Sequence, residues 1–589
     1  MRFLSKGLFA ALFLLVLISV SPAAQTVPVG QLRWMLVRVS PDNPPTARSL
    51  HSLGFEHLDQ VDGGFEVVAT ELELELIRNF GLRAEVLDRD FGRTLVERNT
   101  QKSILAAAGS FATGSMAGYF NPDEILAFVD SLRNSTGDSL LGDTAVVGLS
   151  LQERPVWMVE LGHERSEGAP EVFFNSLTHA REGMSVMALL YFIRYLVDNY
   201  AVNDSVRWLM DHRRIFCVPV VNPDGFEINW NLYDSGGGFG LWRKNARDNN
   251  GDGTLDNQDG VDLNRNFSYA WGYDNIGSDS TWYENDFRGD SAFSEPESRV
   301  MRDFISGRNF RVAINCHAYG NSLLKPWSYI AAETPDSAVF NRIGAKLVGG
   351  SGYVHGNATS ILNYPANGEF TDWEYGDSAG GKIIAWTAEI GERSQGFWPP
   401  ADQIEPIAQN VLPTLFAAAR AAGFWPELEI VQVNEVPGFP RRRSILFRVD
   451  NVGLADTDRP FTITLGRESA GVSALRTVTV DTSAVYPRAD SLLVEFGPEV
   501  YSLSGSLVVE QEGLTVTSYP LAVERPATDI AADLDGNGRT DIFDLLEILR
   551  VVSRGVPDGD DPARYDLNGD GRFDIFDLID MLKRLRPRN

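Results

Sequence analysis

Five short apolar runs, alternating with longer helical patterns across residues 113–425, constrain the fold of this chain more than any other feature. The runs are rich in branched and aromatic residues, as buried strands are: PVWMVEL, EVFFNSL, RRIFCVPVV, FRVAINCH and KIIAWTAEI. The clearest helical patterns are GMSVMALLYFIRYLVDNY, EPESRVMRDFIS and PIAQNVLPTLFAAARAAG. Because strands that are apolar along their whole length need cover on both faces, we predict an α/β domain with helices on both sides of one sheet.

The rest of the chain is long enough for further domains, since 589 residues exceed what one core usually serves. Residues 25–112 contain a strand pattern, QLRWMLVRV, and a helix followed by a strand, TELELELIRNFGLRAEVL, which predict a small α+β domain. A prodomain and a packing domain both fit this segment. Residues 427–525 hold short β-rich runs such as SILFRVDNVG and SLLVEFG between turn residues, which predict a β-sandwich.

The first 24 residues have the pattern of a secretory signal peptide. Arg2 and Lys6 precede an apolar run at residues 7–20, and small residues follow it. The run is short for a membrane anchor, and no later stretch is long and apolar enough to span a bilayer. We therefore expect a secreted protein without a membrane span.

The net charge and the number of cysteines narrow the class of protein further. The net charge is −28, from 80 acidic and 52 basic residues, which excludes nucleic-acid binding because phosphates need a basic face. The two cysteines, Cys217 and Cys316, are too few for a disulfide framework. Two buried thiols and a single bridge both remain compatible with the sequence.

An internal repeat begins near residue 529, where DLDGNGRTDIFDLLEIL is followed by DLNGDGRFDIFDLIDML. Both copies carry oxygen-bearing side chains at positions 1, 3, 5, 9 and 12 and glycine at position 6, the spacing of a calcium loop. Position 12 is Asp where an EF-hand has Glu. The predicted calcium ligands are Asp533, Asp535, Asn537, Asp541 and Asp544 in the first copy and Asp566, Asn568, Asp570, Asp574 and Asp577 in the second.

The repeat pair at residues 529–589 resembles a type I dockerin, the module that binds cohesin domains. The resemblance implies two calcium ions and a cohesin-like partner. Dockerins contact their partner with residues just inside each helix, which here are Ile542-Phe543 and Ile575-Phe576. Because the two faces are nearly identical, we expect that either copy can dock.

A third loop with calcium spacing, DNNGDGTLDNQD, lies at residues 248–259 inside the predicted α/β domain. It has Gly253 at position 6. We hypothesise a third calcium site that braces this segment, and a flexible acidic loop is the alternative. The candidate ligands are Asp248, Asn250, Asp252, Asp256 and Asp259.

Candidate zinc ligands stand at the ends of the apolar runs. His179 and Glu182 follow the run EVFF three residues apart, and His317 ends the run RVAINCH in a chain with only seven histidines. Two imidazoles, one carboxylate and an open position for water form a catalytic zinc site. Glu389 ends the run IIAWTAEI, where an acid is costly unless it has a function, and a carboxylate near a metal-bound water can act as general base.

These residues lie in motifs that resemble the zinc carboxypeptidase family, which includes carboxypeptidase A and carboxypeptidase T. The motifs occur in the family's order: THAREG, NPDG, WRKNAR, GVDLNRNF, FSEPE, NCHAYG, YPANGEFTDWEYG, TAEIGE and GFWPP. The resemblance covers residues 113–425. It implies a mixed central sheet with helices on both faces, one zinc ion and peptide or protein substrates with a free C-terminus.

The resemblance also implies roles for individual residues. His179, Glu182 and His317 match the zinc ligands, Glu389 matches the general base, and Arg243 matches the arginine that stabilises the oxyanion. Asn264 and Arg265 match the pair that binds the terminal carboxylate, a group that only an exopeptidase needs to bind. The remaining substrate contacts are expected at Arg181 in the cleft, Tyr364 as the mobile tyrosine and Thr371 in the side-chain pocket.

The sequence leaves alternatives open for the preferred terminal residue and for the reaction. Thr371 takes the place that is acidic in lysine- and arginine-specific members, which favours neutral terminal residues, whereas the nearby Glu369 would admit basic ones. Ala318 replaces a serine that often follows the second histidine ligand in animal enzymes. An amidase of the same fold acting on cell-wall peptides is the alternative enzyme. A non-catalytic binding protein would need a missing ligand or base, and all four residues are present.

Overall fold

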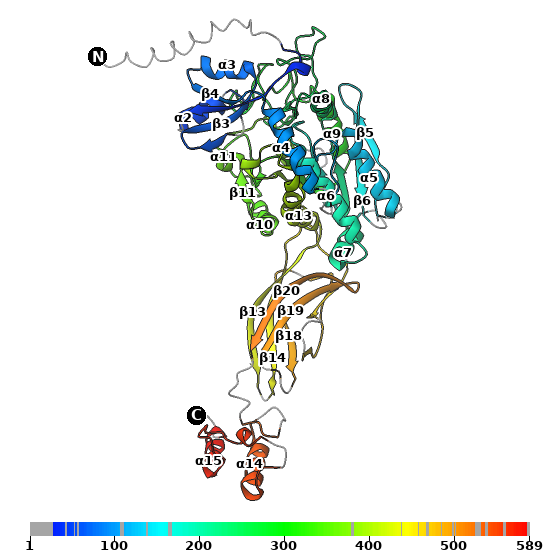
Figure 1. Ribbon diagram of the computed structural model, residues 1–589. Helices are drawn as coiled ribbons and strands as arrows, with labels where there is room; N and C mark the ends of the chain where they lie inside the picture. Colours follow the sequence, from blue (N-terminus) through cyan, green and yellow to red (C-terminus); the bar gives the residue numbers. More distant parts are fainter. Residues whose placement is uncertain are drawn as a thin grey trace, which may run out of the picture. The chain divides into compact units, whose positions relative to one another are not determined.

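The computed structural model describes residues 27–41, 44–51, 53–55, 58–106, 111–136, 140–162, 168–377, 382–437, 439–457, 459–466, 471–484, 486–497, 500, 502–524, 532–535, 540–557 and 561–585 (Figure 1). The expected signal peptide and the expected ligand Asn537 lie outside these residues. No helix within them has the length and apolar character needed to cross a bilayer. The chain divides into two compact units, one of residues 1–161, 171–194 and 215–418 and one of residues 162–170, 195–214 and 419–589.

The first unit begins with a four-stranded antiparallel sheet in the order β2-β3-β1-β4. Its strands are β1 (Met35–Ser40), β2 (Asp59–Val61), β3 (Gly64–Ala69) and β4 (Arg83–Asp88), with helices α2 (Pro44–His51), α3 (Glu71–Asn79) and α4 (Phe91–Ala106). A capping box between Thr70 and Glu73 starts α3. Val37, Val39, Leu50 and Ile77 form its core. The expected small α+β fold is confirmed.

The main sheet has eight strands in the order β11-β10-β12-β9-β7-β8-β6-β5. They are β5 (Ala145–Leu149), β6 (Pro155–Leu161), β7 (Glu171–Asn175), β8 (Arg214–Val218), β9 (Phe310–His317), β10 (Ser322–Lys325), β11 (Val354–Asn357) and β12 (Ile384–Glu389). Strands β7, β9 and β12 run parallel, whereas β10 pairs antiparallel with β12 and β6 pairs antiparallel with β8. The sheet is therefore mixed, as expected.

Helices cover both faces of this sheet. The first unit's remaining helices are α5 (Pro122–Thr136), α6 (Gly183–Asn199), α8 (Pro223–Asp234), α9 (Pro296–Ser306), α10 (Ser337–Val348), α11 (Ala358–Ile361), α12 (Phe370–Gly376) and α13 (Ile404–Ala421). Phe173 of β7 packs against Phe304 of α9, and Phe174 packs against Phe192 of α6. Because consecutive strand residues point to opposite faces, α9 and α6 lie on opposite sides.

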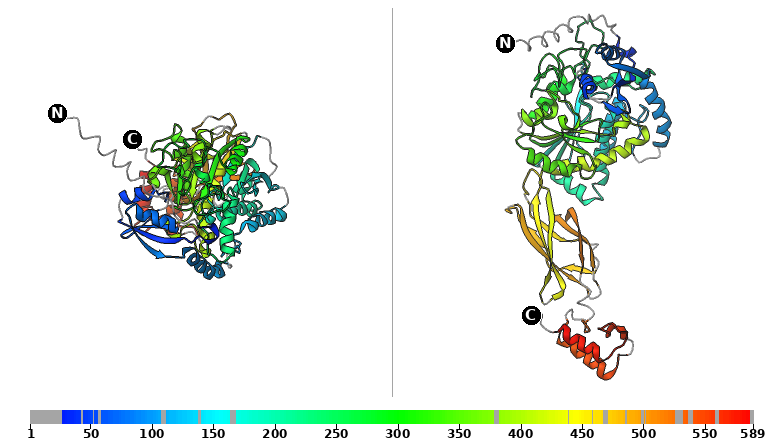
Figure 2. Two further views of the ribbon diagram at one scale, coloured as in Figure 1. Left: turned by 90° about the horizontal axis from the view of Figure 1, so that it is seen from above. Right: turned by 90° about the vertical axis from the view of Figure 1, so that its left-hand side faces the viewer.

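The second unit contains a β-sandwich of two four-stranded sheets, β13-β14-β18-β16 and β17-β15-β19-β20, drawn in yellow and orange in Figure 2. The strands are β13 (Pro426–Val436), β14 (Phe439–Asn451), β15 (Phe461–Leu465), β16 (Val472–Ala474), β17 (Val478–Val480), β18 (Arg488–Phe496), β19 (Ser502–Gln511) and β20 (Leu514–Glu524). Alternate residues such as Ile445, Phe447 and Leu492 are fully buried. Helix α7 (Asp204–His212) contacts this sandwich, with Trp208 Nε1 donating to Gln511 Oε1 at 2.8 Å.

Two helices end the described chain, α14 (Ile542–Arg554) and α15 (Ile575–Arg584). Ile548, Tyr565 and Met581 are buried in their common core. Short 3-10 turns complete the elements: η1 (Val29–Gln31), η2 (Leu263–Arg265), η3 (Arg393–Gln395), η4 (Ala401–Gln403) and η6 (Pro562–Arg564).

The open question about the cysteines is resolved by the sheet order. Cys217 lies on β8 and Cys316 on β9, and β7 separates these two strands. Both are buried free thiols. Burial raises the pKa of both thiols, that of Cys316 to about 12, so both groups stay protonated and pack as small apolar side chains.

Candidate active site

The three expected metal ligands meet at the carboxyl ends of neighbouring parallel strands. His179 and Glu182 lie in the loop between β7 and α6, and His317 ends β9. His179 Nδ1 lies 2.7 Å from Glu182 Oε1 and 3.1 Å from His317 Nδ1, which lies 3.0 Å from Glu182 Oε2. One ligand atom from each residue lies within 4.8 Å of the others, and all three side chains are buried. Two imidazole nitrogens and a carboxylate that converge in this way fit a zinc ion.

The electrostatics of this cluster also favour a cation. Burial opposes the charge on Glu182, yet the two histidines hold the pKa of its carboxyl well below the usual range. Burial likewise opposes a charged imidazole at His317, but Glu182, with Glu389 and Glu369 nearby, raises its pKa to about 9. The carboxylates that raise this pKa stabilise positive charge at a buried position, as binding of a divalent metal requires.

Asp262 orients two of the functional side chains, and sequence reasoning missed it. Its Oδ1 lies 3.2 Å from His179 Nε2, the ring atom that faces away from the cluster. Its Oδ2 accepts two hydrogen bonds from Arg243, from Nε at 2.9 Å and Nη2 at 2.7 Å. An acid on the outer nitrogen of a ligating histidine fixes the ring so that the other nitrogen faces the metal. The only signal in the sequence was its place in the motif GVDLNRNF, two residues before Asn264.

Arg243 borders the metal cluster. Its Nη1 lies 3.3 Å from His179 Nδ1, and its side chain is 1% exposed. Asn229 of α8 positions this segment, because its Nδ2 donates to the carbonyls of Ala180 and Trp242. A guanidinium held beside the metal is placed to bind an oxygen that gains negative charge there.

Glu389 lies one strand away from a metal ligand. It ends β12, and its register partner on the parallel strand β9 is His317. The side chain is 7% exposed. A buried carboxylate beside a metal-bound water is what a general base requires.

Asn264 and Arg265 form a buried pair in the 3-10 turn η2. Asn264 Oδ1 accepts a hydrogen bond of 3.0 Å from Phe370 N, so its amide NH₂ is the end able to donate to another group. Arg265 Nη1 donates to the Asn264 carbonyl at 2.8 Å, and Arg265 is 3% exposed. The two side chains present donors in one place, as binding of a carboxylate requires.

Arg181 packs against aromatic side chains. Its guanidinium stacks over Phe397 at 4.4 Å, and the ring of Tyr319 packs 4.9 Å from the same phenylalanine. Thr371 is fully buried, 2.6 Å from Thr387 Oγ1, and accepts a hydrogen bond from Asn315 Nδ2 at 2.9 Å.

The N-terminal α+β domain contacts two tyrosines of the catalytic domain. Tyr319 Oη donates to Asp59 Oδ2 of β2 at 3.1 Å, and the ring of Tyr364 lies 4.6 Å from that of His51 of α2. Burial raises the pKa of Asp59 to about 6. The N-terminal domain therefore contacts Tyr364, the expected mobile tyrosine, and Tyr319, which packs beside Arg181 through Phe397.

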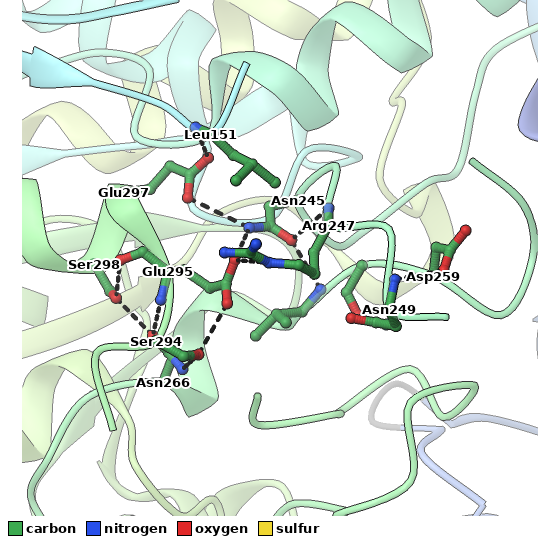
Figure 3. A network of polar contacts seen from close by, with 12 residues as sticks. Leu151, Asn245, Arg247, Asn249, Asp259, Asn266, Ser294, Glu295, Glu297 and Ser298 are labelled. Atoms are coloured by element: carbon green, nitrogen blue, oxygen red, sulfur yellow. Dashed lines mark hydrogen bonds and ion pairs between the residues drawn. The ribbon is translucent and has the colours of Figure 1, made fainter. Parts of the chain in front are cut away.

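A polar network braces the segment between Arg243 and the pair Asn264–Arg265 (Figure 3). Asn245 Nδ2 donates to Glu295 Oε2 at 2.8 Å and to Glu297 Oε2 at 3.3 Å, and Arg247 Nε donates to Glu295 at 3.1 Å. Burial raises the pKa of Glu297 to about 7. Ser298 Oγ donates to Asn266 Oδ1 at 2.6 Å, which connects the network to the residue after Arg265.

The loops at residues 248–259 and 566–577 have the same internal hydrogen bonds. In each, the carboxylate at position 1 accepts from the N–H groups of positions 4 and 6, and the carboxylate at position 12 accepts from positions 2 and 9. The bonds run to Asp248 from Gly251 and Gly253, to Asp259 from Asn249 and Asp256, to Asp566 from Gly569 and Gly571, and to Asp577 from Leu567 and Asp574. The loop from the catalytic unit thus folds like the second repeat.

The first repeat brings its acids closest together. Asp533, Asp535 and Asp544 offer carboxylate oxygens within 4.8 Å of one another, and Asp544 accepts from Leu534 N and Asp541 N. In the other two loops, the described carboxylates do not meet within this distance as a group of three. Calcium takes oxygen ligands, so the donor set fits that ion.

Two histidines and a glutamate meet at the strand ends of a mixed sheet, with a second glutamate, an arginine and the buried pair Asn264–Arg265 nearby. This arrangement is typical of a zinc-hydrolase site. Residues 126–414 match the family described as zinc carboxypeptidase, and residues 531–586 match the dockerin type I domain. The chain therefore contains a zinc carboxypeptidase domain followed by a type I dockerin domain, which confirms both resemblances.

Relatives and solved structures agree with this assignment. Carboxypeptidase B of Astacus astacus is 29% identical over 302 residues, 50% of this chain and 93% of that protein. Carboxypeptidase A1 of Bos taurus is 27% identical over 339 residues, 56% of this chain and 76% of that protein. The crystal structure of carboxypeptidase A from Helicoverpa armigera matches with TM-score 0.55 and 25% identity, over 66% of this chain and 97% of that one. Thrombin activatable fibrinolysis inhibitor, with TM-score 0.53 and 20% identity over 66% and 98%, shares the fold.

Proposed function

We propose that the chain is a secreted zinc metallocarboxypeptidase that hydrolyses the C-terminal peptide bond of peptides and proteins. The observation that carries this proposal is the buried cluster of His179, Glu182 and His317 at the same sheet edge as Glu389. The buried clamp of Asn264 and Arg265 supplies the preference for a chain end. That clamp, and relatives that are carboxypeptidases, do not favour the cell-wall amidase alternative.

The chemistry follows from the arrangement of these side chains. A zinc ion bound by His179, Glu182 and His317 would supply a Lewis acid that lowers the pKa of a water and polarises a carbonyl. The Glu389 carboxylate takes the proton from the attacking water and later gives it to the leaving amine. Arg243, fixed by its two hydrogen bonds to Asp262, donates to the carbonyl oxygen as that atom gains charge.

Substrate binding places the last residue of a chain against the clamp. Arg265 and the amide of Asn264 bind the free terminal carboxylate through charge-assisted hydrogen bonds. Tyr364 closes over the terminal residue, and Arg181 contacts the residues that precede it. A peptide amide has no terminal charge, so it leaves the buried Arg265 without its partner.

We expect the zinc-loaded chain to release the last residue of a blocked dipeptide that has a free carboxylate, and to cut its C-terminal amide at least about 100-fold more slowly, because the clamp then loses a charged hydrogen bond. A zinc chelator should abolish the cleavage, and added zinc should restore it. The measurement is amino-acid release by the full chain, before and after limited proteolysis. If the acid and the amide are cut equally fast, the chain is not an exopeptidase.

We further propose that residues 25–112 act as a prodomain. Support comes from Asp59 and His51, which contact Tyr319 and Tyr364 in the cleft. While these contacts persist, the residues upstream of the scissile bond cannot occupy the same space. Proteolysis after this domain would expose the cleft, which is why the activity assay includes a proteolysed sample.

The dockerin domain is proposed to attach the enzyme to a cohesin-like partner outside the cell. Ile542, Phe543, Ile575 and Phe576 begin the two helices and are 55%, 59%, 52% and 60% exposed. Large apolar side chains exposed in this way mark a protein-binding surface. The equal exposure of the two pairs agrees with docking through either copy.

Calcium binding provides a test of the three loops. The whole chain is expected to bind about three calcium ions, and Asp252→Ala in the loop at residues 248–259 should reduce this to about two, because each loop needs its oxygen at position 5. The matched control is Asp570→Ala, the same position in the second dockerin loop, which should also give about two ions. Equilibrium dialysis measures the stoichiometry. Unchanged binding by Asp252→Ala, beside a loss in Asp570→Ala, would refute the third site.

A further inference from the structure

A buried acid at the start of α12 contacts strand β12. Glu369 immediately precedes α12 and is 4% exposed. Its Oε1 accepts a hydrogen bond of 3.1 Å from Thr387 Oγ1, two residues before Glu389. Its Oε2 has no hydrogen-bond partner among the described residues. A buried carboxylate oxygen without a donor destabilises the fold, so its presence beside the candidate active site calls for an explanation.

The neighbours of Glu369 locate it within the substrate cleft. The next residue, Phe370, donates its N–H to Asn264 of the clamp at 3.0 Å. The residue after that, Thr371, bonds to Thr387 and to Asn315, which lies two residues before His317 on β9. Glu369 therefore lies beside the clamp and beside the strands that end in His317 and Glu389. When the clamp holds the carboxylate of a substrate, we expect the side chain of its last residue to lie in this region.

Two other buried acids, Asp372 and Glu374, lie within α12 and accept hydrogen bonds. Asp372 accepts hydrogen bonds from Ser328 N at 2.9 and 3.0 Å and from Tyr329 N at 3.3 Å, so it fixes a loop. Glu374 accepts from Asn315 Nδ2 at 2.7 Å, and burial raises its pKa to about 8. Glu374 also has one oxygen without a hydrogen-bond partner among the described residues, but it lies four residues after Phe370, whose N–H contacts Asn264.

From this geometry we infer that Glu369 reads the side chain of the terminal residue and selects a cationic one, lysine or arginine. The inference rests on the proposed carboxypeptidase activity and names its substrate class. A cationic head at this point donates to the unpartnered oxygen of Glu369 and pairs with its charge, whereas an apolar side chain leaves both unsatisfied. Thr371 then supports Glu369 through its contact with Thr387. The resulting preference for basic residues differs from the neutral preference that Thr371 alone suggested.

The test compares kcat/KM for blocked dipeptides that end in lysine, arginine or phenylalanine. The zinc-loaded full chain, also assayed after limited proteolysis, should prefer the basic substrates. Glu369→Gln should lower the ratio of kcat/KM for lysine over phenylalanine by about 100-fold, because it removes the charged partner of a buried ion pair. The matched control, Glu374→Gln, removes an acid from the same helix and should change this ratio by less than about threefold.

Several outcomes would overturn the inference. A wild-type chain that releases phenylalanine but not lysine or arginine overturns it and leaves the carboxypeptidase proposal standing. If the ratio falls in Glu374→Gln and not in Glu369→Gln, then Glu374 selects the terminal residue and the inference about Glu369 is wrong. If Glu369→Gln does not fold, product inhibition of the wild type decides, because free lysine and arginine should inhibit more strongly than free phenylalanine. A chain that cuts no substrate after proteolysis overturns both proposals.

Discussion

Replacing Glu389 by Gln is expected to lower kcat by about 10³-fold while zinc remains bound, because an amide of the same shape cannot take a proton from water. Glu389 ends β12 beside His317, but it is not one of the three residues whose ligand atoms converge. Its loss should therefore remove a chemical step and leave the metal site intact. The measurements are kcat on a blocked dipeptide and zinc content by elemental analysis.

An exposed glutamate provides the control for this substitution. Glu333 pairs with Lys325 at 2.6 Å and is 55% exposed, so Glu333→Gln should change kcat by less than about twofold. Retention of more than a tenth of the activity in Glu389→Gln would show that another group accepts the proton. Loss of zinc in the same variant would show that Glu389 supports the metal site.

The metal site was predictable because the sequence places its members at strand ends. His317 and Glu389 each finish an apolar run, and the carboxyl ends of parallel strands meet at one edge of a sheet. His179 and Glu182 occupy the loop after a third such strand, three residues apart. Local pattern and sheet geometry were thus sufficient to bring the ligands and the base together. The motifs then supplied the roles of Arg243, Asn264 and Arg265.

Contacts between distant parts of the chain could not be predicted in this way. Asp59 and Tyr319 are 260 residues apart, and nothing in the pattern of either segment indicates that they meet. The unpartnered oxygen of Glu369 is likewise a property of tertiary packing, since it depends on which donors the neighbouring strands bring. The sequence therefore predicted the N-terminal α+β domain but not the surface through which it contacts the catalytic domain. It also did not decide whether Thr371 or Glu369 determines the specificity.

The contacts of Asp262 in the active site could not be predicted from the sequence either. As a sequence feature, it is one acid among 80 acidic residues, and its two partners lie 83 and 19 residues earlier in the chain. In the fold it is fully buried, and His179 and Arg243 hold the pKa of its carboxyl well below the usual range although burial opposes this. One carboxylate thus contacts both the proposed metal ligand His179 and Arg243, the arginine proposed to bind the oxyanion.

Asp262→Asn is therefore expected to weaken zinc binding by about 10- to 100-fold, because the outer nitrogen of His179 loses the charged partner that fixes its ring. It should also lower kcat/KM at saturating zinc by about 10³-fold, because Arg243 is left buried without its carboxylate and shifts from the carbonyl oxygen. Zinc affinity is measured by competition with a chromogenic chelator, and kcat/KM on a blocked dipeptide at excess zinc. The two effects separate because added zinc corrects only the first.

The matched control for this substitution is Asp224→Asn. Asp224 is also fully buried and accepts from an arginine, Arg154 Nη1 at 2.9 Å, but it lies outside the metal cluster. Its substitution should lower the melting temperature and leave zinc affinity unchanged. If Asp262→Asn binds zinc as tightly as the wild type and loses only stability, like Asp224→Asn, then Asp262 merely neutralises Arg243. In that case the orientation of His179 must come from the loop between β7 and α6 alone.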